Sequence, residues 1–256
     1  MFPYRNELQP LRRPHVTLAL IAANGLVWVL LQGAGAPQPL MQSVCDLGLI
    51  PGELTGTVPP GTSFTLGDGY ACVTEAARHA SHLFTSMFLH GSWVHLLGNM
   101  WFLWIFGRNV EDAMTRPRFL ALYVLGGLAA AAAQVAASPS SGIPMVGASG
   151  AISAIMGAYL ILYPNVRVYA LVPLGFFITS IALPAWSMLL YWAGIQLLSG
   201  LASIGDSTGA GVAFWAHVGG FIAGMMLVKP FVQTDRIAAR DTRRWRPRRI
   251  LFSHGE

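Results

Sequence analysis

The stretch "PMVGASGAISAIMGAYL", residues 144–160, is apolar enough to form a membrane-embedded helix, yet it carries a serine near its start. Ser149 follows Gly147 and Ala148 and precedes Gly150. A hydroxyl group among small residues inside a membrane commonly contacts a neighbouring helix, and Ser149 taken alone fits that interpretation. Partners elsewhere in the chain decide whether it also has a chemical role.

The amino-acid composition indicates a protein that is embedded in a lipid bilayer. Of its 256 residues, 54% are hydrophobic and only 11% are charged, and the mean hydropathy is +0.53. A soluble domain carries about 25% charged residues. One soluble core of this size could not hide so much apolar surface, so we expect an integral membrane protein.

Uncharged runs predict the membrane spans, because a helix needs about 20 apolar residues to cross the hydrocarbon layer. A run over 168–205 is too long for one crossing and is interrupted by Pro173 and Pro184, which disfavour helix interiors. We therefore interpret 168–182 as a partly embedded connection. The sequence predicts an all-α fold, a polytopic bundle of six transmembrane helices at about 15–32, 90–107, 119–137, 143–163, 184–203 and 211–228.

Basic residues test this count, because Lys and Arg gather on the cytoplasmic side. With six spans and both termini inside, 15 of the 16 basic residues lie inside, and only Arg78 lies outside. The predicted organisation is a cytoplasmic segment 1–14, a membrane domain 15–228 with an external loop 33–89, and a basic cytoplasmic tail 229–256. We expect the tail to meet anionic lipids rather than nucleic acid. The compact core without a targeting extension suggests the bacterial inner membrane.

The external loop contains both cysteines, Cys45 and Cys72, and their separation fits no zinc-ligand pattern. A disulfide would form if the loop faces an oxidising compartment, and two free thiols are the alternative. Both interpretations stay open from the sequence.

Polar residues inside membrane spans are costly and usually functional. His90, His95, Asn99 and His217 are such residues here. His95 and Asn99 are four residues apart and share one helix face. A zinc pair would have histidines four apart with a glutamate between them, whereas His90 and His95 are five apart without one, so no metal site is predicted. Simple hydrogen bonding of His95 and Asn99 to neighbouring helices is the alternative.

Small residues predict a close contact between two of the spans. In "AFWAHVGGFIAGMML", residues 213–227, Gly220 and Gly224 are four apart and leave a face without side chains. The predicted span 143–163 has a matching stripe that includes Gly150 and Gly157. Two such faces let helix backbones approach closely.

That contact would bring Ser149 and His217 to the same depth near the outer surface. A serine is a weak nucleophile until a base removes its proton, and histidine is the usual base. Ser149 also lies near the N-terminus of its predicted helix, where free backbone N–H groups favour a developing negative charge. The pair therefore predicts nucleophilic catalysis.

Three motifs in this order, "HGSWVHLLGN", "GASG" and "AHVGGFIAG", resemble the rhomboid intramembrane serine proteases over about residues 80–228. The resemblance implies that Ser149 is the nucleophile and His217 the general base and acid. It assigns His95 and Asn99, with the backbone N–H of Ser149, to oxyanion stabilisation. It also implies that His90 shapes the site and its access to water, and that Gly147 lets the substrate pass close to the serine.

The implied activity is an endopeptidase that cuts single-pass membrane proteins near the outer membrane surface, with no metal or organic cofactor. Its partners would be transmembrane protein substrates and membrane lipids, not nucleic acid; no oligomeric state is predicted. The polar, Gly-rich loop 202–211 is expected to be a movable cap. The alternatives are a non-catalytic rhomboid-like protein that binds membrane clients, and a small transporter.

The chain departs from the family pattern at two places. Ser81 and His82 stand where many rhomboids have a Trp-Arg pair, and Ser153 stands where some have a tyrosine that stacks on the catalytic histidine. Glu111, four residues after Gly107, matches a family Gly-xxx-Glu pattern for which we expect a structural role. With Ser153 in place of a ring, the orientation of His217 is left to contacts between helices.

Overall fold

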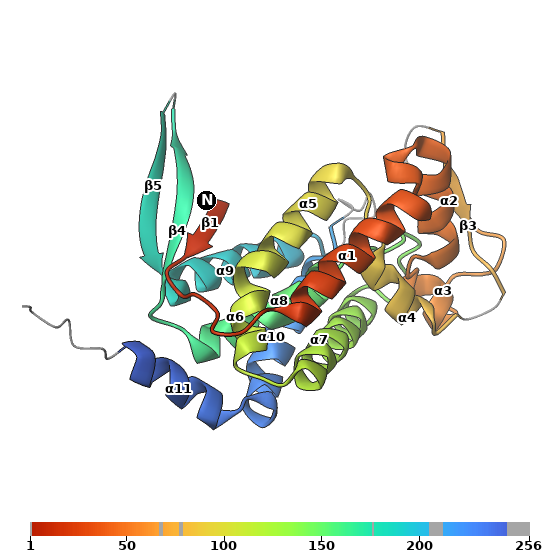
Figure 1. Cartoon of the computed structure of the whole chain (residues 1–256). Coiled ribbons are helices and arrows are strands. Elements are labelled where there is room, and N and C mark those ends of the chain that lie inside the picture. The colour runs from red at the N-terminus through yellow and green to blue at the C-terminus, as the bar shows by residue number, and fades with distance from the viewer. Residues whose placement is uncertain (1, 67–68, 77–78, 176, 205–211, 245–256) are drawn as a thin grey trace, which may run out of the picture.

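The most enclosed helix of the protein is α8 (Ser149–Leu162), in which every residue from Gly150 to Leu160 is buried. A computed structural model describes residues 2–66, 69–76, 79–175, 177–204 and 212–244, and these residues are mostly helical (Figure 1). A helix that is apolar on all sides belongs in the interior of a bundle. Helices α5 (Trp93–Phe102), α7 (Arg116–Ala137), α9 (Ala185–Ala202) and α10 (Phe214–Phe231) pack against it, and α1 (His15–Leu30) packs against α5 and α7.

The contact between α8 and α10 is built from backbone rather than side chains. A Cβ atom added to Gly220 would overlap the carbonyl of Gly150, and one added to Gly224 would overlap the backbone of Ala154. Likewise, a Cβ on Gly157 would overlap the carbonyl of Phe221. The sequence predicted that Gly150 would also face the partner helix. A Cβ added to Gly150 would instead overlap the side chain of Ala130 in α7.

Helix α1 begins where a carboxylate from another helix caps it. Glu111, in α6 (Arg108–Asp112), accepts hydrogen bonds from the backbone N–H groups of Val16 and Thr17 at 2.9 and 2.8 Å. The hydroxyl of Thr17 donates to the same carboxylate at 2.7 Å. A negative charge at a helix N-terminus satisfies donors that the helix itself leaves open. Glu111 therefore joins α6 to the start of the chain's first long helix.

The second predicted span begins later than expected. Ser92 caps α5, its hydroxyl accepting from the N–H of His95 at 3.1 Å, so His90 precedes the helix. A capping serine in extended conformation explains this boundary. The helix then widens through a π-helical turn, η3 (Leu103–Gly107), before it continues as α6.

The all-α prediction needs correction, because the chain also forms two small sheets. Residues expected to be a partly embedded connection form the antiparallel pair β4 (Arg167–Leu174) and β5 (Phe177–Pro184), and β1 (Phe2–Asn6) adds to β4. Gly175 turns the hairpin with φ +61°, a conformation that favours glycine. Prolines that break helices, together with many β-branched and aromatic residues, favour strands here. Figure 1 shows this hairpin projecting away from the helices.

The segment 33–89, predicted to be an external loop, is folded on itself and joined by a disulfide. It contains the helices η1 (Gly33–Gly35), α2 (Pro37–Leu47), α3 (Pro51–Thr55), α4 (His82–Thr85) and η2 (Ser86–Phe88), and the hairpin β2 (Ser63–Thr65) and β3 (Ala71–Val73). Cys45 at the end of α2 is bonded to Cys72 of β3. Of the two interpretations left open by the sequence, the structure has the disulfide.

Each of the six segments predicted to span the membrane contains a helix. Within the described residues, α7, α9 and α10 are long and apolar enough to cross a bilayer, and α1 and α8 are shorter apolar helices. The predicted basic tail 229–256 begins in the last turn of α10 and continues into α11 (Thr234–Arg244). Most of the expected cap loop 202–211 and the end of the tail, 245–256, lie outside the described residues.

Replacing Gly224 with alanine should destabilise the bundle, because the new Cβ would meet backbone atoms of Ala154 that cannot move aside. Overfilling a packed interior costs about 1–3 kcal/mol, so we expect the midpoint of thermal unfolding in detergent to fall by roughly 3–10 °C. Gly25→Ala on α1 is the control, since a Cβ there meets nothing within 4 Å. Equal unfolding temperatures for the two variants would contradict the backbone contact.

Candidate active site

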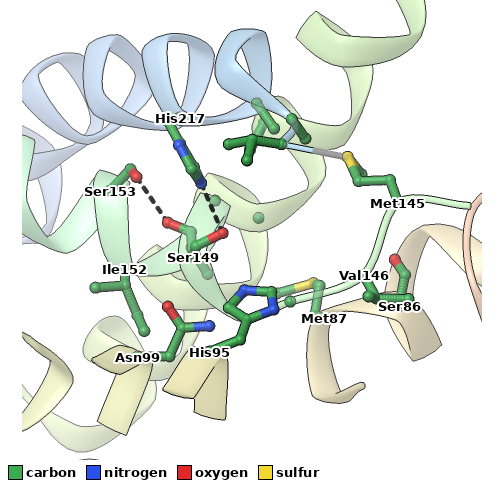
Figure 2. Close-up of a pocket in the computed structure, with 18 of the residues that line it drawn as sticks. Ser86, Met87, His95, Asn99, Met145, Val146, Ser149, Ile152, Ser153 and His217 are labelled. Carbon is green, nitrogen blue, oxygen red and sulfur yellow. Dashed lines mark hydrogen bonds between the residues drawn. The ribbon is translucent and has the colours of Figure 1, made fainter. Parts of the chain in front are cut away.

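Ser149 and His217 meet where α8 and α10 approach each other. The Oγ atom of Ser149 lies 2.8 Å from Nε2 of His217 (Figure 2). Ser149 is the first residue of α8, and His217 lies in the first turn of α10. A hydroxyl within hydrogen-bond reach of an imidazole is the geometry from which a serine can be activated.

The backbone just before α8 is held by hydrogen bonds to other segments, and Gly147 there has a conformation that favours glycine. Met145 exchanges two backbone hydrogen bonds with Leu49, at 2.7 and 3.0 Å, and the N–H of Gly147 donates to the carbonyl of Ser86 at 2.9 Å. Gly147 has φ +130°, and a Cβ there would lie 2.8 Å from Cε1 and Nε2 of His95. A side chain at residue 147 would therefore push into the space beside Ser149.

Two potential donors from α5 lie on the other side of Ser149 from His217. Figure 2 shows His95 and Asn99 there. The N–H of Gly91 donates to Nδ1 of His95 over a long 3.4 Å, which leaves the proton of the neutral ring on Nε2, one of the two ring atoms next to Gly147. The Nδ2 group of Asn99 is buried and has no hydrogen-bond partner among the described residues. A buried donor without a partner is costly, and such groups often have a functional reason.

His90 supports the position of His95 from outside the helix. Its ring is fully buried and lies edge-on to the ring of His95, with 5.1 Å between their centroids. Its backbone is fixed by Gln32, whose side chain both donates to the carbonyl and accepts from the N–H of His90 at 2.8 Å. The sequence did not single out Gln32, because nothing in its neighbourhood indicates a contact 58 residues away.

The second nitrogen of His217 has a partner on α9 that the sequence analysis missed. Nδ1 of His217 lies 2.7 Å from Oε1 of Gln196, and the ring of Trp192 lies against the imidazole at a centroid distance of 5.9 Å. The Ser153 hydroxyl instead donates to the carbonyl of Ser149 at 2.6 Å. The sequence does carry a signal for Gln196, because it is an amide within an apolar span, and such side chains commonly hydrogen-bond to neighbouring helices.

One cavity of about 420 Å³ is lined by Ser149, His217, His95 and Asn99, together with Trp192. Its walls are mostly apolar, and the described residues that line it include no Asp, Glu, Lys or Arg. In the part of the chain that the structure describes, no group of three or more His, Cys, Asp or Glu side chains comes together as a metal site. The chemistry available in the cavity is therefore that of hydroxyl, imidazole, amide and backbone groups.

In the segment 33–89, His82 stands where many rhomboids have an arginine. His82 is buried, and its ring lies 4.8 Å from that of His79. Burial, followed by the nearby His79, lowers the pKa of His82, which favours the neutral ring. This position therefore does not reproduce the permanent charge of an arginine.

Comparison with known proteins identifies the family. A family model described as the Rhomboid domain matches residues 77–234, more than half of the chain. The chain belongs to the rhomboid family. That range contains Ser149, His217, His95 and Asn99, and rhomboid proteins are integral to membranes, as the apolar helices of this chain also indicate.

Three relatives show the extent of the similarity. Rhomboid-like protease 5 of Toxoplasma gondii is 32% identical over 162 residues, which cover 60% of this chain and 17% of that protein. RHOMBOID-like protein 12, mitochondrial, of Arabidopsis thaliana is 30% identical over 154 residues, covering 53% of this chain and 46% of that one. Presenilin-associated rhomboid-like protein A, mitochondrial, of Danio rerio is 32% identical over 84 residues, covering 32% and 22%. The chain thus spans less than half the length of each of these relatives.

A fluorophosphonate probe, which reacts with activated serines, should label Ser149 in the purified protein. We expect Ser149→Ala to abolish labelling, because Ser149 is the hydroxyl next to the base. Ser153→Ala is the matched control, since that hydroxyl bonds to a carbonyl and should leave most labelling intact. Labelling measured by in-gel fluorescence that survives Ser149→Ala would mean that another serine reacts.

Proposed function

We propose that this rhomboid protein is an intramembrane serine endopeptidase that cuts single-pass membrane proteins near the outer membrane surface. The observation that carries the proposal is the 2.8 Å approach of Ser149 Oγ to His217 Nε2, in a cavity also lined by Asn99, whose Nδ2 group has no partner among the described residues. In the proposed reaction, Ser149 attacks a substrate carbonyl as its proton passes to Nε2 of His217. The protonated imidazole then donates to the leaving amine, and water releases the acyl group from Ser149 by the reverse sequence.

The negative charge that forms on the attacked carbonyl needs donors that are already in place. Asn99 Nδ2 is buried without a partner among the described residues, and Nε2–H of His95 faces the same space. The N–H groups at the start of α8 are a third source, because the first turn of a helix leaves its donors open. These groups support an oxyanion site opposite His217.

The length of α8 supports a site below the membrane surface. Its 14 residues span about 21 Å at 1.5 Å per residue, whereas the hydrocarbon layer is about 30 Å thick. Extended backbone such as that before Ser149 is tolerated at this depth where it lines a cavity. A substrate would have to leave helical form there, so we propose substrates with glycine, proline or small residues near the surface.

The proposed topology has six spans and both termini in the cytoplasm. Arg12, Arg13, Arg116 and Arg236 line one cavity, which gathers basic residues from three segments at one end of the helices. The disulfide of Cys45 and Cys72 belongs to the external loop, as expected for an oxidising compartment. These features favour the positive-inside orientation. We propose the bacterial cytoplasmic membrane as the location, although two of the relatives are named mitochondrial.

The direct test is cleavage of a transmembrane substrate by the purified full chain in detergent. The substrate should carry glycine or proline near the outer end of its span, with a stable polyleucine span as the control substrate. We expect a single cut in the first substrate, mapped by mass spectrometry, and no cut after Ser149→Ala or His217→Ala. A properly folded wild type that labels with no probe and cuts no such substrate would favour the client-binding alternative.

Removing the amide of Asn99 should slow the chemical step more than it weakens substrate binding. Loss of one oxyanion donor typically lowers kcat by about 10²–10³-fold, and we expect Asn99→Leu to fall in this range with little change in KM. Asn99→Gln, which keeps an amide, should retain more activity than Asn99→Leu. A kcat for Asn99→Leu within about three-fold of wild type would remove Asn99 from the proposed oxyanion site.

A further inference from the structure

His217 is the base of the proposed reaction, and its ring can serve only in one of its two neutral forms. To accept the proton of Ser149, Nε2 must carry no hydrogen, so the single ring proton must be on Nδ1. The other tautomer would present Nε2–H to Ser149 and could not act as a base. Whatever contacts Nδ1 therefore decides which form is present.

The contact at Nδ1 is the side chain of Gln196, and its geometry favours the reactive form. Oε1 of Gln196 lies 2.7 Å from Nδ1, and Nε2 lies 2.8 Å from the hydroxyl of Ser149. A carbonyl oxygen can only accept, so it pairs with an Nδ1–H group. The three side chains then form a relay in which the hydroxyl donates to Nε2 and Nδ1–H donates to the amide.

The described walls of the cavity provide no carboxylate that could do this instead. Many serine proteases hold their histidine with an aspartate, which orients the ring and stabilises its charged form. A carboxylate inside a membrane is costly, whereas a neutral amide keeps the orienting hydrogen bond at lower cost. Gln196 thus supplies the geometric part of that role without a charge.

A second contact comes from the same face of the same helix. Trp192 and Gln196 are four residues apart on α9, one turn from each other, and both contact His217. Ser153, where some rhomboids have a stacking ring, points its hydroxyl to the carbonyl of Ser149. In this chain α9, rather than α8, provides both the ring and the acceptor that hold the histidine.

We propose that Gln196 is a positioning residue of this protease, selecting the Nδ1–H tautomer of His217 and fixing its ring toward Ser149, with Trp192 as the supporting ring. This proposal rests on the proposed function, because it gives His217 the part of the base. It also makes α9 part of the catalytic apparatus. A change on α9 that separates Gln196 from His217 would disable the base without touching Ser149.

The test replaces Gln196 in the full-length protein in detergent and measures kcat, KM and the rate of fluorophosphonate labelling. Gln196→Leu and Gln196→Met remove the acceptor at similar size, and each should lower kcat and the labelling rate by about 10- to 100-fold while KM changes little. Gln196→Glu keeps an acceptor and should recover most of the lost labelling. Leu198→Ala, at an exposed position on the same helix, is the control and should match wild type.

A second measurement reads the tautomer directly. Nitrogen NMR of protein with ¹⁵N-labelled histidine distinguishes Nδ1–H from Nε2–H, with the His217 signals assigned by their loss in His217→Asn. We expect Nδ1–H in wild type, and a mixture or Nε2–H in Gln196→Leu. A merely structural role for Gln196 would lower the unfolding temperature without changing the tautomer.

The outcomes separate this proposal from the proposed function. Wild-type rates and an unchanged tautomer in Gln196→Leu, from a protein that does cleave substrate, would overturn the role of Gln196 alone. If wild type neither labels nor cleaves, the proposed function fails, and an Nε2–H ring in that protein would overturn the role of Gln196 as well. Should Gln196→Leu fold poorly, the comparison of Gln196→Met with Gln196→Glu gives the same decision.

Discussion

The backbone contact between α8 and α10 is the constraint on which the site depends. Gly157, Gly220 and Gly224 have no side chains to hold the helices apart, and a Cβ at any of them would overlap backbone of the other helix. Ser149 and His217 come from these two helices, and the side chain of Ser149 is short. A 2.8 Å distance between Oγ and Nε2 is reached because the backbones approach so closely.

The other side of the site depends on α5 and the chain before it. Ser92 starts the helix after His90, which leaves His90 free to lie against the ring of His95. The two histidines nearest Ser149 then have opposite hydrogen-bond environments. His95 accepts from a backbone N–H at Nδ1, and His217 faces an amide oxygen at Nδ1. One ring is thereby suited to donate through Nε2, and the other to accept there.

Where the chain departs from the family pattern, other elements of the structure contact the residues concerned. With Ser153 at the position where some rhomboids have a ring, α9 brings Trp192 and Gln196 to His217. The buried His82 and the disulfide of Cys45 and Cys72 belong to the segment 33–89, which has its own small helices and strands. The groups around Ser149 and His217 are held by different elements, so a change in one element need not displace the others.

The sequence by itself determined the membrane character, the segments that contain the six long helices, and the motifs that place the chain in the rhomboid family. These features are local, because hydropathy, glycine spacing and short motifs can be read within one segment. It did not predict the sheet of β1, β4 and β5, since a short apolar run with prolines fits either an embedded connection or a strand until a partner strand is known. Only the tertiary structure decided that Gln32 fixes His90 and that Gln196 faces His217. Such contacts depend on how each helix is rotated about its axis, and that rotation is set by all its neighbours at once.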